Sequence, residues 1–123
     1  MSRPVAGSIA LVDWRTGALP AEPTKRRPAV VVEDDGLFPD AYPNTLVVPL
    51  TTDAELAHSA FSVMIAPTPE NGATARCWAL AHHVTSVSLK RVATTASRVS
   101  AGQLTSIRTR IALAIGLSST VSS

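Results

Sequence analysis

The residues best suited to chemistry are a run of cations and a threonine, each beside a predicted strand. Three consecutive basic residues, 25–27, directly precede the apolar run 28–32, and Thr51 follows the apolar run 45–50. A planar Arg guanidinium donates two parallel hydrogen bonds to a phosphate and keeps its charge. A threonine hydroxyl at a rigid strand end adds one more donor. Together these groups favour electrostatic stabilisation of a phosphoryl-transfer transition state.

Other kinds of active site find little support in the sequence. His82 and His83 are adjacent in a predicted strand, where neighbouring side chains point to opposite faces and do not chelate one ion. His58 lies in a different segment, and no Asp or Glu follows position 70. Cys77 has no predicted helix N-terminus beside it to activate a thiolate, and no Gly-x-Ser-x-Gly sequence is present. We therefore expect neither a metal nor a cofactor.

Charge is divided unevenly along the chain. Residues 1–70 hold all nine acids and five basic residues, a net charge of −4, whereas residues 71–123 hold six basic residues and no acid, a net charge of +6. Positive potential attracts polyanions, so nucleic acid is a candidate partner, and a solvated basic surface is the alternative. With five aromatic residues, the chain has too few for a base-stacking platform.

Length and composition are typical of one domain. A chain of 123 residues, 46% of them hydrophobic, can bury a core, and a single cysteine excludes an internal disulfide framework. No apolar run approaches the ~18 residues that span a bilayer, and no signal peptide is evident. We expect a cytoplasmic protein with one domain over residues 1–123, a core at about 7–117 and a flexible tail at 118–123.

Short apolar runs separated by turn residues predict a sheet of several strands. We expect Pro28 at the first position of its strand, where a missing N–H is tolerated, and Pro49 where its strand leaves the ladder. Residues 15–27 are long for a hairpin loop, which is typical of a functional loop. The expected strands are residues 8–14, 28–32, 45–50 and 61–66, with one or two more between 78 and 87.

The C-terminal part changes to a helical period. Ser100 and Gln103 have the spacing of a capping box, and Gly116 suits the left-handed position after a helix. Steps of three and four then form one apolar stripe: Leu104, Ile107, Ile111 and Ile115. The expected fold class is α+β, a small β-barrel with a C-terminal amphipathic helix.

Two motifs at this spacing resemble those of a known family. The first is Lys25-Arg-Arg-Pro28-Ala-Val-Val-Val32, and the second is Asn44-Thr-Leu-Val-Val-Pro-Leu-Thr51. Gly7-x-Ile9 and Val12-Asp13 precede them, and residues 102–117 follow as the last helix. Over about residues 7–117 the chain resembles the MazF/PemK toxins, the endoribonuclease halves of type II toxin–antitoxin modules. The resemblance implies an SH3-like barrel of the CcdB/MazF kind.

The resemblance also implies a homodimer that cuts single-stranded RNA at short sequences without a metal. The substrate's own 2′-OH would attack the adjacent phosphorus and leave a cyclic phosphate. By position, Arg27 would neutralise the phosphorane and take part in proton transfer, and Thr51 would hold a non-bridging oxygen. Glu22 would orient Arg27 or contact RNA, and an ordinary salt bridge to Lys25 or Arg26 is the alternative.

Further RNA contacts follow from the resemblance by position. They are Glu22, Lys25, Arg26, Thr52, His83 and Ser86. His82-His83 stands where many members carry an acidic residue and Gln, so the cleavage sequence is not carried over. By position His83 would contact RNA or move a proton, and an ordinary surface histidine on a strand is the alternative that the residues themselves favour.

The implied protein partner is a cognate antitoxin whose acidic, partly disordered segment occupies the RNA groove. Two other classes of function stay open. A gyrase poison of CcdB type shares the fold, but it depends on a Trp near its C-terminus, where this chain ends Ser-Ser-Thr-Val-Ser-Ser. The other is a barrel that binds nucleic acid or protein without catalysis, against which the presence of Arg27 and Thr51 argues.

Overall fold

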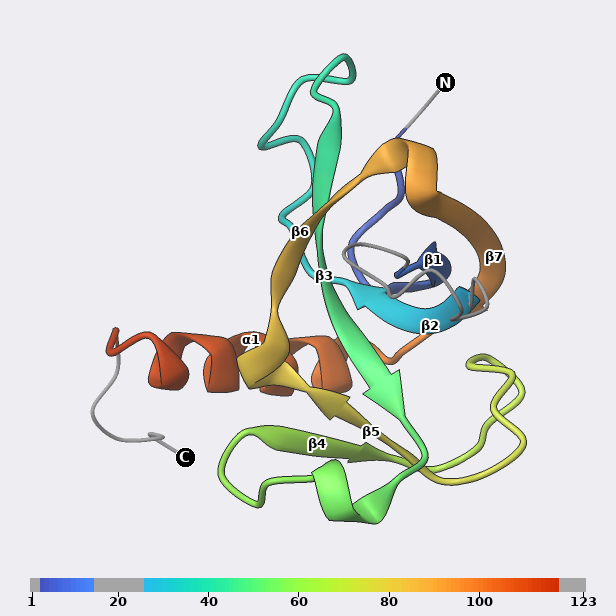
Figure 1. Ribbon diagram of the computed structural model, residues 1–123, viewed down its shortest axis with the longest axis vertical. Coiled ribbons are helices and arrows are strands. Elements are labelled where there is room, and N and C mark those ends of the chain that lie inside the picture. The colour runs from blue at the N-terminus through green and yellow to red at the C-terminus, as the bar shows by residue number, and fades with distance from the viewer. Residues whose placement is uncertain (1–2, 15–25, 118–123) are drawn as a thin grey trace, which may run out of the picture.

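One antiparallel sheet and one C-terminal helix make up the structure, a computed structural model that describes residues 3–14 and 26–117 (Figure 1). The sheet order is β4-β5-β3-β2-β1-β7, and β6 also pairs with β3. The strands are β1 (Ser8–Asp13), β2 (Arg26–Val31), β3 (Asn44–Thr51), β4 (Ser62–Ile65), β5 (Cys77–Leu80), β6 (Thr85–Ser88) and β7 (Val92–Arg98). The helices are η1 (Ala54–Leu56), η2 (Ala81–His83) and η3 (Leu89–Arg91), which are 3₁₀, and α1 (Ala101–Ala114). No helix in the described ranges is long and apolar enough to cross a membrane.

The sheet bends around β3. Residues 44–47 of β3 pair with β6, and residues 50–51 pair with β5 along the same edge, whereas residues 47–49 pair with β2 on the other edge. The end strands β4 and β7 do not pair with each other in the part of the chain that the structure describes. The β4–β5 loop (residues 66–76) bridges the gap, because the Glu70 carbonyl accepts a hydrogen bond from Arg98 N at 2.9 Å. The predicted α+β class with a barrel-like sheet is confirmed, although the barrel is not closed by strand pairing.

Alternation along the central strands divides the buried residues into two clusters. In β3, Val47 belongs to one cluster and Val48 to the other, and neither side chain is exposed. Strand β3 is therefore buried on both faces. Ile107 of α1 is fully buried in the same cluster as Val48, so the helix covers one face of the sheet.

The predicted capping of α1 is confirmed at both ends. Ser100 Oγ accepts from Gln103 N at 3.1 Å, and Gln103 Oε1 accepts from Ser100 N at 2.9 Å. Gly116 follows the helix with φ of 84°, a conformation that glycine adopts without strain. The predicted apolar stripe is wrong at its last member: Ile115 is 64% exposed, because α1 ends at Ala114 and Ile115 is its C-cap.

Removing the N-cap should measurably destabilise the fold. Ser100→Ala leaves the Gln103 N–H without its side-chain acceptor, so we expect the free energy of unfolding to fall by about 1 kcal/mol. Urea unfolding followed by circular dichroism measures the difference. Thr105→Ala, at an exposed position of the same helix, is the control and should cause no loss. An equal loss in both variants would show that the cap does not contribute.

Both prolines sit deeper in their strands than predicted. Pro28 is the third residue of β2, not the first, at a point where β2 pairs with β1 but has not yet met β3. Pro49 stays in the ladder opposite Ala29, while the other edge of β3 is changing partner from β6 to β5. Each proline therefore lies beside an interruption in pairing, where a missing N–H is tolerated.

Two further differences concern the last third of the chain. β7 was not predicted, because its segment is rich in Thr, Ser and Ala and lacks large apolar residues. His82 and His83 lie in the 3₁₀ helix η2 rather than in a strand, and their ring centroids are 4.4 Å apart. The prediction that they point to opposite faces of a sheet is therefore wrong.

A buried ion pair ties the N-terminal segment to the end of β2. Glu33 is 5% exposed and accepts hydrogen bonds from Arg3 at 2.8 and 3.0 Å. Thr45 Oγ1 donates to the same carboxylate at 2.9 Å, and the Arg3 guanidinium carbon lies 5.8 and 5.7 Å from the ring centroids of Phe38 and Tyr42. The pair thus joins three separate segments of the sequence.

Candidate active site

Arg27 is held by the beginning of β2. It lies opposite Val12 of β1 in an exposed position, and the residues that follow it, 29–32, are buried. Those buried residues anchor the strand and therefore fix the backbone from which the guanidinium extends. Among the described residues no hydrogen bond or ion pair engages this guanidinium, so its five donors are available to a ligand.

Thr51 is held by the end of β3. It pairs with Trp78 of β5, and the preceding Leu50 is buried. Thr51 Oγ1 accepts a hydrogen bond from Asp53 N at 3.0 Å. Because a hydroxyl can accept and donate at once, its hydrogen is left to donate to an incoming oxygen.

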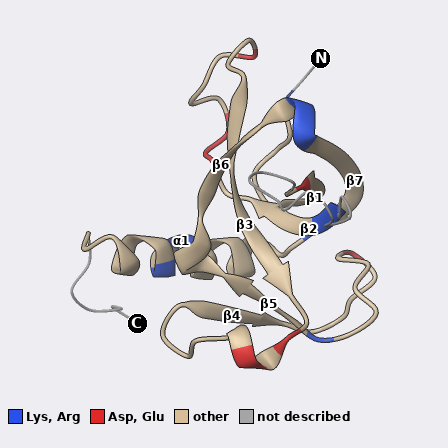
Figure 2. Ribbon diagram, viewed as in Figure 1, with Lys and Arg blue, Asp and Glu red and all other residues tan. Residues whose placement is uncertain are grey.

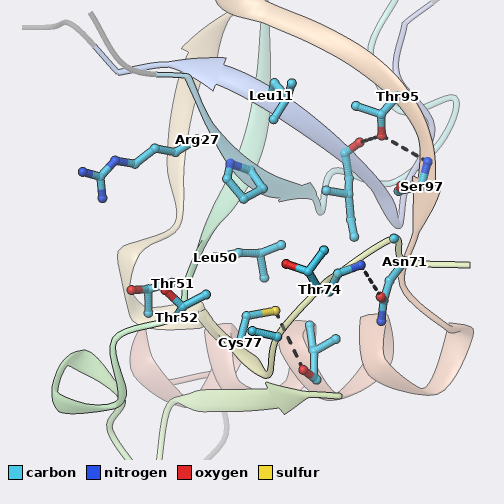
Figure 3. A pocket seen from close by; sticks show the side chains of 16 residues that line it. Leu11, Arg27, Leu50, Thr51, Thr52, Asn71, Thr74, Cys77, Thr95 and Ser97 are labelled. Carbon is cyan, nitrogen blue, oxygen red and sulfur yellow. Dashed lines mark hydrogen bonds between the residues drawn. The ribbon is translucent and has the colours of Figure 1, made fainter. Parts of the chain in front are cut away.

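Both side chains line one pocket with a volume of about 500 Å³ (Figure 3). In Figure 3, Arg27, Thr51 and Thr52 lie on the left side of the pocket. Residues of β1, β3, β5, β7 and the β4–β5 loop all contribute to its wall. The structure therefore brings together three of the predicted site residues.

The other predicted site residues are placed differently. Ser86 lies opposite Leu46 of β3, five residues before Thr51, which is about 16 Å along a strand. Its hydroxyl accepts a hydrogen bond from Asn44 Nδ2 at 2.9 Å. Ser86 and His83 do not line the pocket.

The cationic run is only partly described. Arg26 is exposed beside Arg27 at the start of β2 and does not line the pocket. Glu22 and Lys25 lie outside the described residues, so their predicted roles stay predictions.

His83 belongs to a group of rings on the surface around η2. His82 lies between its neighbours, with its ring centroid 4.4 Å from that of His83, 5.6 Å from Phe61 and 6.1 Å from His58. Burial first, and then the charges of His83 and His58, lower the pKa of His82. Within residues 3–14 and 26–117, no three His, Cys, Asp or Glu side chains are placed to hold a metal ion.

Cys77 is a wall residue of the pocket rather than a nucleophile. It is 7% exposed, its Sγ donates to the Ile65 carbonyl at 3.8 Å, and burial raises the pKa of its thiol. A protonated, buried thiol is inert.

Charge around the pocket does not follow the division of the sequence. Figure 2 shows positive residues at the beginning of β2 and in η3, and acidic residues at η1. Arg27, the charged residue among the described residues that line the pocket, belongs to the half of the chain with a net negative charge. The imbalance of charge along the sequence therefore does not locate the site, whereas the strand ends do.

Sequence reasoning missed the far wall of the pocket. Thr74 of the β4–β5 loop and Thr95 and Ser97 of β7 line it. The pairing of β7 with β1 was not predicted. The β-branched residues Val92, Thr94 and Thr95 were the available signal.

Comparison with known proteins agrees with this architecture. The family described as "PemK-like, MazF-like toxin of type II toxin-antitoxin system" matches residues 6–115. No curated protein matches the sequence.

Solved structures of similar fold cover nearly the whole chain. An endoribonuclease in complex with its cognate antitoxin, from a mycobacterial species, is 18% identical with a TM-score of 0.72, covering 94% of this chain and 98% of its own. MazF from Deinococcus radiodurans is 25% identical with a TM-score of 0.65, covering 92% and 96%. The Mycobacterium tuberculosis toxin MazF-mt6 is 17% identical with a TM-score of 0.70, covering 90% and 98%. With the family match over residues 6–115, these likenesses lead to one conclusion: the chain belongs to the PemK-like, MazF-like toxins of type II toxin–antitoxin systems.

Proposed function

We propose that this toxin is an endoribonuclease that cuts single-stranded RNA, mRNA included, and so inhibits translation and growth. The observation that carries the proposal is that Arg27 and Thr51, from two different strands, line one pocket. A structure of the same fold is described as an endoribonuclease, which supports the proposal.

The reaction is a displacement at phosphorus within the substrate. The 2′ oxygen bonds to the adjacent phosphorus as its proton leaves, the bond from phosphorus to the 5′ oxygen breaks, and that oxygen takes up a proton. The products are a 2′,3′-cyclic phosphate and a 5′-hydroxyl end. Negative charge grows on the non-bridging oxygens, where Arg27 donates two parallel hydrogen bonds and Thr51 donates one.

Rigid placement of these donors is the physical basis of the rate. Arg27 and Thr51 are each adjacent in sequence to buried strand residues, so neither backbone has to be ordered when RNA binds. Preorganised donors cost no reorganisation at the moment of reaction. Thr52 would contact the same phosphate group or its neighbour, whereas His83 and Ser86 would contact nucleotides farther along the strand.

The proposed partners are a cognate antitoxin and a second copy of the chain. An acidic, partly disordered antitoxin segment would pair with the cations at the beginning of β2 and exclude RNA. Two similar structures, one mycobacterial and one from Deinococcus radiodurans, contain a toxin with its antitoxin, which supports this partner. A toxin that cuts mRNA would act in the cytoplasm as a homodimer.

Cleavage should continue when divalent metals are removed. Neither proposed donor is a metal ligand in the reaction, so purified protein incubated with a mixed RNA in EDTA should cut at the rate seen without chelator. Primer extension locates and quantifies the cuts.

A matched variant distinguishes cleavage by the protein itself from cleavage by contaminating nucleases. Thr51→Ala, purified in parallel, should be slower by about 10²–10³-fold, since it loses one donor to the developing charge. Loss of cleavage on chelation, restored by a single metal, would overturn the proposed mechanism.

A further inference from the structure

The pocket beside Arg27 and Thr51 is larger than a phosphate requires. At about 500 Å³ it falls within the range of sites that hold small organic molecules, roughly 300–1,000 Å³. A phosphate group bound at Arg27 would leave most of this volume unfilled. What occupies the remainder is therefore a separate question from how the phosphate is held.

The deeper wall is apolar and carries no charge. Ile9, Leu50, Ile65 and Cys77 are buried core residues that also line the pocket. Arg27 is the one charged side chain among the lining residues that the structure describes. Such a wall disfavours a second phosphate or a charged peptide side chain, because burying an unpaired charge is costly. It suits a neutral, flat group with apolar faces.

The opposite wall supplies polar atoms without a fixed partner. Thr95 Oγ1 is engaged, since it donates to the Ile9 carbonyl and accepts from Ser97 N at 3.1 Å. In contrast, no hydrogen bond within the described residues engages the hydroxyls of Thr74 and Ser97. Each can donate to or accept from a ligand edge.

Hydrogen bonds and close packing fix the backbone that carries these two hydroxyls. Asn71 is 5% exposed; its amide oxygen accepts from Thr68 N and Ala73 N, and its amide nitrogen donates to the Ala66 carbonyl. This network holds the loop that carries Thr74. Ser97 Oγ would lie 2.8 Å from a Cβ at Gly72, so loop and strand are in close contact there.

We propose that this pocket holds the nucleobase of a nucleotide adjoining the phosphate at Arg27 and Thr51, with Thr74 and Ser97 contacting the base edge. The inference rests on the proposed function, because it takes the ligand to be RNA. Unstacked bases are commonly bound between apolar side chains and read by hydrogen bonds to their edges. Thr74 and Ser97 then contribute to the choice of cleavage sequence.

Methyl NMR tests the inference directly. The probes are the four nucleoside 3′-monophosphates, with ribose 5-phosphate and inorganic phosphate as ligands that lack a base. All should shift the backbone signals of Arg27 and Thr51, but nucleotides alone should shift the methyl signals of Leu50 and Ile65. N-acetyl-leucine amide, which imitates an apolar peptide side chain, is the competing ligand.

Conservative variants then test the two hydroxyls. Ser97→Ala and Thr74→Val should each change the affinity for at least one base by about 2- to 10-fold, while affinity for ribose 5-phosphate stays constant. Thr94→Val, which replaces a β7 threonine that does not line the pocket, is the matched control and should change neither affinity.

The outcomes separate this inference from the proposed function. Equal shifts with ribose 5-phosphate and with nucleotides, or methyl shifts with N-acetyl-leucine amide alone, would overturn the base pocket. Base-dependent methyl shifts without RNA cleavage would support the base pocket and contradict the proposed endoribonuclease activity. Cleavage of RNA without base-dependent shifts would support the endoribonuclease activity and contradict the base pocket.

Discussion

Replacing Arg27 with alanine is expected to slow RNA cleavage by about 10²–10³-fold, as losing a preorganised donor typically does. The side chain is exposed and makes no hydrogen bond to other described residues, so the free energy of unfolding should not change. Single-turnover cleavage of a labelled oligonucleotide measures the rate, and urea unfolding checks the fold.

Arg27→Lys should fail almost as completely as the alanine variant. Lysine keeps the positive charge but presents a point charge instead of a planar fork, so it cannot make two parallel hydrogen bonds. Arg98→Ala removes a positive charge from exposed β7 outside the pocket and is the matched control. If Arg27→Ala cleaves at the wild-type rate, the catalytic site lies elsewhere.

The largest effect on stability is expected at Glu33. Glu33→Ala leaves the Arg3 guanidinium buried without its carboxylate, and breaking a buried pair in this way typically costs about 3–5 kcal/mol. Urea unfolding measures the change. Asp34→Ala is the matched control, because Asp34 is exposed and lies 3.9 Å from Arg108, a surface contact of about 0–1 kcal/mol.

The same pair predicts how stability depends on pH. Burial acts to raise the pKa of Glu33, but hydrogen bonds from Arg3 and Thr45 and the charge of Arg3 outweigh it and lower the pKa. The contribution of this pair to the free energy of unfolding is therefore fully present above the unfolded pKa of about 4.3. It is lost as pH falls through the folded pKa. Wild-type protein should lose more stability below pH 4.3 than Glu33→Ala does. Parallel acid dependence of the two would contradict this account.

The parts of the site that sequence reasoning found are those whose signal is local. Arg27 and Thr51 each adjoin an apolar strand, and a proline marks each motif. The capping box at Ser100 is equally local, and it is present. In each case a few neighbouring residues determine the backbone conformation.

The parts that were missed depend on contacts between distant segments. Glu33 reads as a turn residue after a strand, and only the fold brings Arg3, 30 positions earlier, to its carboxylate. Ser97 has no apolar pattern of its own and becomes a pocket residue because β7 pairs with β1. Neither could be predicted without the tertiary arrangement.

The pairing of β1 with β7 has a consequence for how the molecule is made. Ser8 of β1 is opposite Arg98 of β7, so β1 leaves the ribosome well before the strand with which it pairs. Contacts between such distant residues form slowly, because the loop between them must be closed first. Ile9 and Ser97, on the two strands, both line the pocket. The site is therefore incomplete until β7 has left the ribosome, and on the proposed function this interval is time in which an antitoxin can meet the toxin before it cuts RNA.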